Sequence, residues 1–581
     1  MADSPTRAKP DAAHLESRDT TMDLSGLQHL SVYEQKCALV SRELDHQGMG
    51  RYQWYIWFLC GFGYFLDLLW AQAFALVLSP LQQELGFSNN QSGNISMSFN
   101  VGLTTGAFFW GFMSDIIGRR WAFNLTCLLS SVFGLCLGAA NNYNTFLVLT
   151  AFIGFGVGGN IPVDGAIFLE FAPQRRQYML ACLSIFQPAG VIACSALAFA
   201  FIPTHSCSPN FSEPNPLPSC YNVSTPDAAC CSREANMGWR YLLYTLGALT
   251  LAVFILRTLI FRCRETPRFL IYRGQDARAI RTLEYVAKVN RQKCQISLQL
   301  LDSLQNEYDL KKARSQLSPP SPMSPLSPPS PLSPLSPSEN RKEFIQKSRK
   351  QKLGSELARF KLLFATRRMT SLTILTWLTY ILDFGGFNIA GFYLPRILAL
   401  KNGQESISLT HTYASYIYCY VPGILAVLLG AYASQIPALG QKWTMVASSG
   451  LMATSIFLLS RVNSAATSEG LFALEYFFQS TFNAVLYGWT PQAFPAPIRG
   501  TACGVASFWG RLFGIVSPLI AQHLYGQASG NRGNVDGVLY LAGGVTMGCV
   551  LTTALLPRTA AEEEEMKARD PSYEPIASPR V

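Results

Sequence analysis

Several ionisable residues stand inside long apolar stretches of this sequence, where charge is costly, and we single out Asp67, Asp164, Asp383, Glu475 and Arg511. An ionised side chain at the centre of a bilayer costs at least about 2.5–3.5 kcal/mol on insertion scales, so each is a candidate for function. Acids in such segments relay protons or bind ions, and this is the chemistry they predict. A purely structural role remains open for Asp67 and Asp383 and is favoured for Glu475.

Amide and aromatic side chains in neighbouring stretches could surround a bound solute: Gln187, Asn388, Tyr487 and Trp489. Polar groups flanked by aromatic rings suit polyhydroxylated or mixed organic solutes. Tyr and Trp also serve as interfacial or packing residues in membrane proteins, and the sequence does not choose between the two roles.

The elements that must position these residues follow from composition. The chain has 581 residues, of which 49% are hydrophobic and 14% charged, with a mean hydropathy of +0.18. A soluble chain carries about 25% charged residues. The balance excludes an ordinary soluble enzyme and a disordered scaffold, and it predicts a multi-pass membrane protein. We find no nucleotide loop, metal cluster or nucleophile motif, so we expect no enzyme, no cofactor and no metal site.

A window of about 20 residues gives twelve apolar segments, six on each side of a polar linker. They lie near 55–78, 95–113, 123–140, 146–168, 180–202, 241–261, 372–393, 413–432, 445–459, 471–490, 503–520 and 538–556. The expected units are a polar tail at 1–50, a first half at 51–261, a linker at 262–370, a second half at 371–557 and an acidic tail at 558–581.

Basic residues orient these segments. Arg119 and Arg120 follow the second segment, and Arg175 and Arg176 follow the fourth. By the positive-inside rule both termini and the linker are cytosolic, and the N-terminal tail has no signal-peptide pattern. The net charge of +10 therefore reflects topology and lipid contact rather than nucleic-acid binding. We expect a monomer in the plasma membrane or an endomembrane.

The loop 204–237 has the composition of an extracytosolic segment. It carries four cysteines and two glycosylation sequons, at Cys207, Cys220, Cys230, Cys231, Asn210 and Asn222. Disulfides form in oxidising compartments, and four cysteines allow three pairings that the sequence cannot distinguish. A zinc site is the less favoured alternative because no tight paired spacing is present.

The linker contains seven serines at three-residue spacing, each followed by Pro: Ser318, Ser321, Ser324, Ser327, Ser330, Ser333 and Ser336. A polyproline II helix has three residues per turn, so the seven hydroxyls would share one face. A disordered spacer at 318–338 and a substrate for a proline-directed kinase are both open interpretations.

The two sets of segments repeat each other. The first contains Tyr64-Phe-Leu-Asp67 and the seventh contains Tyr380-Ile-Leu-Asp383. After the second segment comes Gly111-x-x-x-Asp115-x-x-Gly118-Arg119-Arg120, and the copy after the eighth has lost its acid. The repeat with this loop motif resembles the major facilitator superfamily. Other motifs are similar to its sugar porter, organic ion and synaptic vesicle glycoprotein branch: Gly48-x-Gly-Arg51, Gly154-x-Gly-x-Gly-Gly159, Glu170-x-x-Pro173-x-x-Arg176, Glu265-Thr-Pro267-Arg268, Pro491-Gln-x-Phe-Pro495 and Gly510-Arg511-x-x-Gly514.

The resemblance implies an all-α membrane protein with twelve transmembrane helices in two six-helix pseudo-repeats, and a substrate site between the halves near the midplane. It also implies a cytoplasmic gate that breaks when the protein opens inward. We call this gate the latch and expect it to comprise Gly111, Asp115, Gly118, Arg119, Arg120, Glu170, Arg176, Arg268 and Arg499.

One departure bears on coupling. Proton-driven sugar porters pair an acid of the first helix with an Arg of the fourth, and here Thr150 stands where that Arg belongs. Either Arg511 of the other half serves Asp67, or Asp67 is a neutral hydrogen-bonding group. We expect a secondary active transporter of a small organic solute, sugar-like or an organic ion, with proton coupling open. The alternative is a non-transporting membrane sensor or regulatory glycoprotein on the same scaffold.

Overall fold

The computed structural model describes residues 32–176, 179–213, 215–223, 229–260, 263–306, 360–361, 363–404, 407–436, 439–462, 464–494, 499–526 and 535–557. The seven Ser-Pro sites of the linker and both chain ends lie outside the described residues.

Each predicted apolar segment lies on a helix or a pair of successive helices. The first half contains α2 (Arg51–Leu85), α3 (Gly93–Ile117), α4 (Arg119–Leu137), α5 (Tyr143–Val157) continued by α6 (Asn160–Phe171), α7 (Met179–Cys182) and η5 (Leu183–Ile185) continued by α8 (Phe186–Phe201), and α9 (Gly238–Ile255) continued by η8 (Leu256–Ile260). The second half contains α14 (Arg367–Gln404), α15 (Leu409–Tyr420) continued by α16 (Pro422–Ala433), α17 (Gly440–Arg461), α18 (Ala465–Ala493), α19 (Arg499–Gly526) and α20 (Val535–Leu555).

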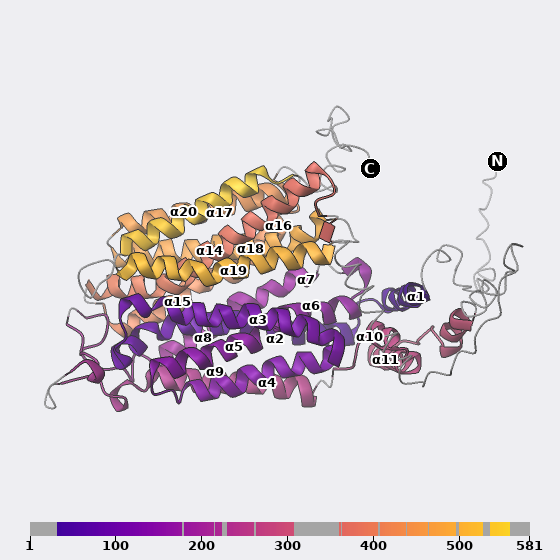
Figure 1. Cartoon of the computed structure of the whole chain (residues 1–581), viewed down its shortest axis with the longest axis horizontal. Coiled ribbons are helices and arrows are strands. Elements are labelled where there is room, and N and C mark those ends of the chain that lie inside the picture. Colours follow the sequence, from indigo (N-terminus) through magenta and orange to yellow (C-terminus); the bar gives the residue numbers. More distant parts are fainter. Residues whose placement is uncertain are drawn as a thin grey trace, which may run out of the picture.

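The helices of both halves run along one common direction, and the halves lie side by side (Figure 1). Ten helical stretches in the described residues are long and apolar enough to cross a membrane. The helices α3 and α18, richer in Ser, Thr, Asn and Gln, pack among them. The halves meet where α3 contacts α19, α8 contacts α15, and α2 contacts α14. The expected all-α fold of six plus six helices is confirmed.

Glycines explain how closely α3 approaches α5. Gly102 and Gly106 face α5, while Gly154 and Gly158 face α3, and a Cβ on any of them would overlap a backbone oxygen of the facing helix. Small residues at four-residue spacing let two helix backbones pack together in a membrane. The glycine motif at 154–159 therefore serves helix packing, with its last two residues at the break between α5 and α6.

Three short helices form a cap at one end of the bundle (Figure 1): α1 (Val32–Gln47), α10 (Pro267–Tyr272) and α11 (Asp276–Asn290). The sequence predicts a polar tail at 1–50, but residues 32–47 are helical because Leu39, Val40 and Leu44 are buried against α10 and α11. Lys36 also donates to Asp276 at 2.5 Å. We call this end of the bundle the cap end, and we call the opposite end, which carries the loop 204–237, the loop end.

The motif Gly48-x-Gly-Arg51 joins the cap to α2. Gly48 has φ of 61°, a left-handed conformation that favours glycine. A Cβ on Gly50 would overlap Asn290, whose side-chain oxygen accepts a hydrogen bond from the Tyr52 N–H at 3.0 Å. Asn290 thus caps the start of α2, and the glycine makes room for it.

Candidate functional site

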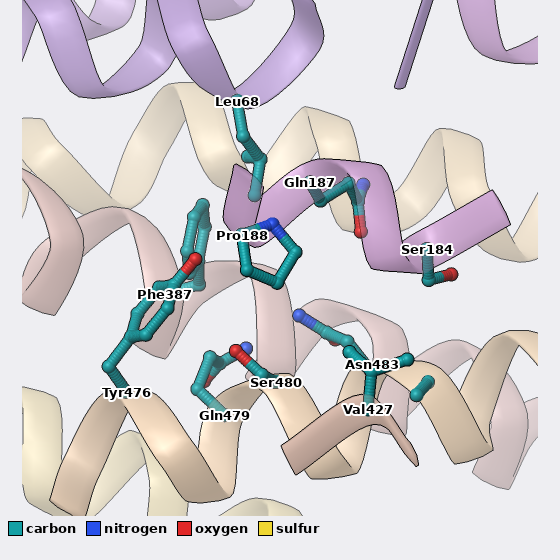
Figure 2. A pocket seen from close by; sticks show the side chains of 11 residues that line it. Leu68, Ser184, Gln187, Pro188, Phe387, Val427, Tyr476, Gln479, Ser480 and Asn483 are labelled. Atoms are coloured by element: carbon teal, nitrogen blue, oxygen red, sulfur yellow. The ribbon is translucent and has the colours of Figure 1, made fainter. Parts of the chain in front are cut away.

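A small cavity lies between the two halves, near the middle of the bundle. Its volume is about 20 Å³, which is roughly the room that one water molecule needs. The first half contributes side chains from α2, η5 and α8, and the second from α14, α16 and α18 (Figure 2). The lining residues are Leu68, Ser184, Gln187, Pro188, Phe387, Val427, Tyr476, Gln479, Ser480, Asn483 and Ala484.

Asp67 and Arg511 come from opposite halves and influence each other's charge. The carboxyl group of Asp67 interacts electrostatically with Arg511, although no ion pair among the described residues joins them. The Nη1 of Arg511 donates to the backbone oxygens of Leu103 at 3.1 Å and Gly158 at 3.5 Å. Arg511 therefore reaches from α19 into the first half, at the break between α5 and α6.

Tyr487 links these groups to the acid of the second repeat. It interacts electrostatically with Asp67, Asp383 and Arg511, and its ring lies 6.4 Å from that of Tyr380. Asp383 is only 1% exposed and accepts a hydrogen bond from Gln479 Nε2 at 3.1 Å. Gln479 itself lines the cavity, so one side chain separates the cavity from Asp383.

Two other predicted polar residues also lie where the halves meet. Gln187 lines the cavity (Figure 2). Asn388 of α14 accepts a hydrogen bond from Asn100 of α3 at 2.9 Å, across the two halves. A Cβ on Gly514 would lie 3.0 Å from Asn388 and 3.2 Å from Asn100, so the glycine of the Gly510-Arg511-x-x-Gly514 motif leaves space for this pair.

Asp164 lies elsewhere than expected. Its carboxylate forms an ion pair with Arg257 of η8 at 2.9 Å, and both side chains are fully buried within the first half. Arg257 also donates to the backbone oxygens of Leu59 and Phe123, and its guanidinium lies 3.9 Å from the ring centre of Phe123. Neither side chain lines the cavity between the halves, although Asp164 interacts electrostatically with Asp67. Sequence reasoning overlooked Arg257, although its place in an apolar stretch was a signal.

Trp489 and Glu475, two further predicted site residues, do not line the cavity. Trp489 is fully buried in the core of the second half with Met445, Phe482 and Leu486, so it is a packing residue. Glu475 is 6% exposed and lies one helical turn from Gln479, on the side nearer the loop end.

Hydrogen bonds between the halves close the loop end. Tyr413 donates to the Leu76 oxygen at 2.9 Å, and Gln72 donates to Tyr420 at 3.0 Å. Further contacts join Arg396 to Asn89, Ser92 to Tyr393, and Gln522 to the Asn90 oxygen. All of them lie between the cavity and the loop end, so a solute cannot reach the cavity from that side in this conformation.

At the cap end, part of the predicted latch comes together. Arg119 forms an ion pair with Glu170, and Arg268 donates to Ser41 of α1 at 2.8 Å. Gly118 has φ of 106° and ends α3 immediately before α4 begins. The other predicted latch residues have different surroundings. Gly111 has open space beside it, and Arg120 and Arg176 are exposed. The side chains of Asp115 and Arg499 lie outside the described residues.

Glu265 is a latch residue that sequence reasoning did not select. Its carboxylate accepts hydrogen bonds from the backbone N–H of Arg119 at 3.0 Å and of Arg120 at 3.4 Å, and so caps the start of α4. Burial raises the pKa of Glu265 above its ordinary value in spite of these donors. The signal for this role was the Glu265-Thr-Pro267-Arg268 motif, whose acid follows the sixth membrane segment.

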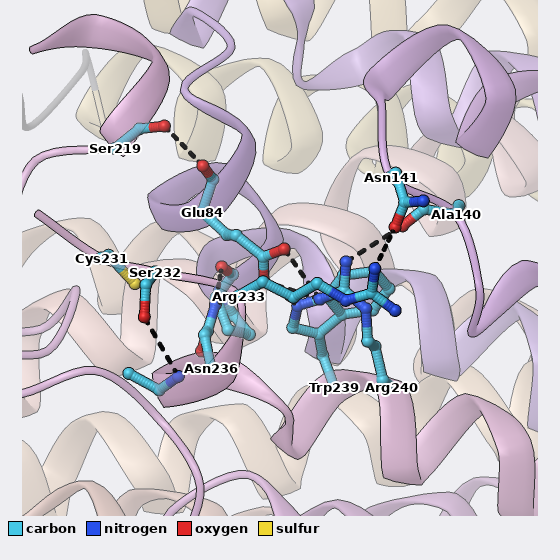
Figure 3. A network of polar contacts seen from close by, with 12 residues as sticks. Glu84, Ala140, Asn141, Ser219, Cys231, Ser232, Arg233, Asn236, Trp239 and Arg240 are labelled. Carbon is cyan, nitrogen blue, oxygen red and sulfur yellow. Dashed lines mark hydrogen bonds and ion pairs between the residues drawn. The ribbon is translucent and has the colours of Figure 1, made fainter.

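The cysteine-bearing loop is bound to the end of α2. Cys207 pairs with Cys231 and Cys220 with Cys230, which accounts for all four cysteines of this loop. Glu84 of α2 accepts hydrogen bonds from Trp239 at 2.9 Å and Arg240 at 2.8 Å, and Ser219 donates to its backbone oxygen (Figure 3).

The two sequon asparagines of this loop have different surroundings. Asn222 is exposed and donates to the Gly86 oxygen at 3.1 Å. Asn210 is half-buried, and its amide donates to Glu213 at 2.6 Å.

Comparisons with known proteins cover nearly the whole chain. The family model described as "Major Facilitator Superfamily" matches residues 58–395 and 376–579. The MFS siderochrome iron transporter 1 of Ceriporiopsis subvermispora is 34% identical over 88% of this chain and 90% of its own length. The major facilitator-type transporter hxnZ of Emericella nidulans is 34% identical over 86% and 83%, respectively.

The fold agrees with that of a solved transporter. A partially occluded, inward-open structure of the xylose transporter XylE from E. coli has a TM-score of 0.59 and 14% identity, covering 88% of this chain and 99% of that chain. Membership of this family makes the protein a multi-pass membrane transporter of a small solute and not an enzyme. On the family match, the relatives and the twelve-helix architecture together, the chain belongs to the Major Facilitator Superfamily.

Proposed function

We propose that this protein carries a small organic solute by alternating access and couples its movement to protons at Asp67. The observation that carries the proposal is the interaction of Asp67 in one half with Arg511 in the other. Thr150 supplies no charge where sugar porters have their Arg, and Arg511 provides a cation from the opposite side of the interface.

The contacts of Arg511 suggest how coupling works. Its guanidinium is held by the oxygens of Leu103 and Gly158, so it stays near Asp67 only while the halves are together. When the halves separate, Asp67 loses this counter-charge and takes up a proton. Return of Arg511 then favours proton release, which ties the protonation of Asp67 to the conformational cycle.

The polar contacts at the two ends support alternating access. At the loop end, the Tyr413–Leu76 and Gln72–Tyr420 hydrogen bonds join the halves and must break for opening on that side. At the cap end, the Arg119–Glu170 pair and Glu265 hold the start of α4 against α6 and the segment that leads into the cap. We assign the loop end to the extracytosolic side, with a glycan at Asn222 or Asn210, and the cap end to the cytosol.

The test is solute-driven proton movement in proteoliposomes. Purified full-length protein is reconstituted into vesicles that contain the pH dye pyranine, and sugars, carboxylates and amines are added one at a time. We expect at least one class of solute to change the internal pH in wild-type vesicles and to lose this effect in Asp67→Asn. Binding of solutes without any flux would instead favour the sensor alternative.

A further inference from the structure

The charges around the cavity do not balance. Three buried carboxyl groups lie next to lining residues: Asp67 precedes Leu68, Glu475 precedes Tyr476, and Asp383 accepts a hydrogen bond from Gln479. The guanidinium that interacts with Asp67 is that of Arg511, on the neighbouring helix α19. Arg511 interacts with Asp67 and is bound to backbone oxygens of the first half. Among the described residues, no basic side chain forms an ion pair with Asp383. The wall contributed by the second half therefore carries an uncompensated acid.

The hydrogen bond to Asp383 determines which atom of the Gln479 amide faces the carboxylate. An ionised carboxylate only accepts hydrogen bonds, so Gln479 must present its Nε2 to Asp383, at 3.1 Å. This leaves its oxygen without a donor, and that oxygen is buried and unpaired. The oxygen of Asn483, one turn further along α18, is also buried and unpaired.

Both amides line the cavity (Figure 2). A buried acceptor without a donor is costly, and a ligand that supplies N–H groups would satisfy both. The remaining lining residues are mostly apolar or aromatic, among them Tyr476, Phe387, Pro188 and Leu68, and three are polar: Ser184, Gln187 and Ser480. Such walls suit a flat or short organic body attached to the donor group. An anion would find neutral donors among the lining side chains, but the nearby carboxylate of Asp383 and the unpaired oxygens of Gln479 and Asn483 would repel it.

We propose that the solute is a small organic cation with N–H donors, which binds with Asp383 as its counter-charge and the oxygens of Gln479 and Asn483 as acceptors. This inference rests on the proposed transport function. In it Asp67 serves the proton and Asp383 serves the solute. The present cavity has room for about one water molecule, so the cation enters after the halves move apart.

The test uses four probes of similar shape: benzylammonium, benzyltrimethylammonium, benzyl alcohol and benzoate. They differ in charge and, between the two cations, in the presence of N–H donors. Affinity for purified full-length protein in nanodiscs is measured by ligand-induced thermal shift. We expect benzylammonium to bind most tightly, then benzyltrimethylammonium, with benzyl alcohol and benzoate the weakest.

Two variants locate the interaction. Asp383→Asn should weaken benzylammonium binding by about tenfold to a hundredfold, as expected for loss of a hydrogen-bonded charge. Asn483→Leu should weaken benzylammonium several-fold and leave benzyltrimethylammonium unchanged, because the latter has no N–H group. Glu469→Gln is the matched control, since Glu469 lies on the same helix and accepts from Tyr418 at 2.5 Å, away from the cavity.

Equal or tighter binding of benzoate would overturn the inference, and so would unchanged benzylammonium affinity in both variants. Failure of all four probes to bind folded wild-type protein would also overturn it. Flux of the same probes into proteoliposomes separates the two proposals. Benzylammonium binding without flux contradicts transport alone, whereas flux of neutral or anionic solutes that Asp383→Asn leaves intact contradicts only the cation site.

Discussion

The buried acids of the two halves have different partners. In the first half, Asp164 is fully buried beside Arg257, which is held in turn by the oxygens of Leu59 and Phe123. In the second half, Asp383 is almost equally buried, and within the part of the chain that the structure describes its one hydrogen-bond partner is the amide of Gln479. An acid with its own cation is a structural element, whereas an acid without one is costly to the fold and available to a ligand or a proton.

The largest expected effect is on the stability of the first half. Arg257→Met should lower the free energy of unfolding by about 3–5 kcal/mol, because it leaves the charge of Asp164 buried without a partner. Thermal unfolding in detergent and the amount of folded protein in membranes measure this loss. The double variant Asp164→Asn/Arg257→Met should recover much of it. If Arg257→Met is as stable as wild type, the Asp164–Arg257 pair does not stabilise the fold, and this would contradict its structural role.

The next largest loss of stability should follow from opening the disulfide-bonded loop 204–237. Replacing Cys207 and Cys231 together with Ser should lower the free energy of unfolding by about 3 kcal/mol, since their bond closes a segment with a sequence separation of 24. The check is the melting temperature with and without reductant. Wild type should shift by more than the variant under reduction, because the variant retains only the Cys220–Cys230 bond, which closes a shorter segment. An unchanged melting temperature would mean that Glu84 and its partners hold the loop by themselves.

Variants of the latch should have an intermediate effect, part of it on stability and part on the rate of solute exchange. Arg119→Ala removes the ion pair with Glu170, and Glu265→Gln removes the negative charge at the start of α4; each charge-assisted interaction is worth about 1–3 kcal/mol and holds the cap end of the first half together. We expect a changed solute exchange rate in proteoliposomes, with smaller losses in membrane abundance. Gln174→Ala, at the exposed start of the short helix η4 (Gln174–Arg176), is the control. Abundance that falls in proportion to activity would make these contacts merely structural.

The smallest effect on stability should come from Asp383→Asn. Asn can still accept the hydrogen bond from Gln479, so the free energy of unfolding should change by less than about 1 kcal/mol, and removal of an unpaired charge could even raise it. Melting temperature and solute binding are measured on the same preparation. Unfolding as severe as that of Arg257→Met would show that Asp383 belongs to the fold, like Asp164.

Much of the fold was predictable because it depends on local patterns. The twelve apolar segments, the repeat of Tyr64 to Asp67 in the second half, and the loop motif that ends at Arg120 are all visible along the chain. Helix α1 was not predicted because it has few apolar residues, and these are buried only by contact with α10 and α11.

The site was less predictable because its partners are distant in sequence. Asp164 and Arg257 are 93 residues apart, and the backbone of Arg119 lies 146 residues from Glu265. Which acid receives a cation is decided by the packing of helices and not by spacing. For the same reason the sequence could not separate Trp489, which is core, from Tyr487, which lies among the charged groups of the interface.

The most direct test of the central claim compares two kinds of flux through Asp67→Asn. Proteoliposomes that contain wild type or variant are assayed for solute exchange at equal pH and for accumulation driven by an imposed pH gradient. If Asp67 couples protons to the solute, the variant should retain exchange and lose gradient-driven accumulation, and Arg511→Gln should also uncouple the two. Wild-type flux that is indifferent to the gradient, or full accumulation in Asp67→Asn, would contradict the account.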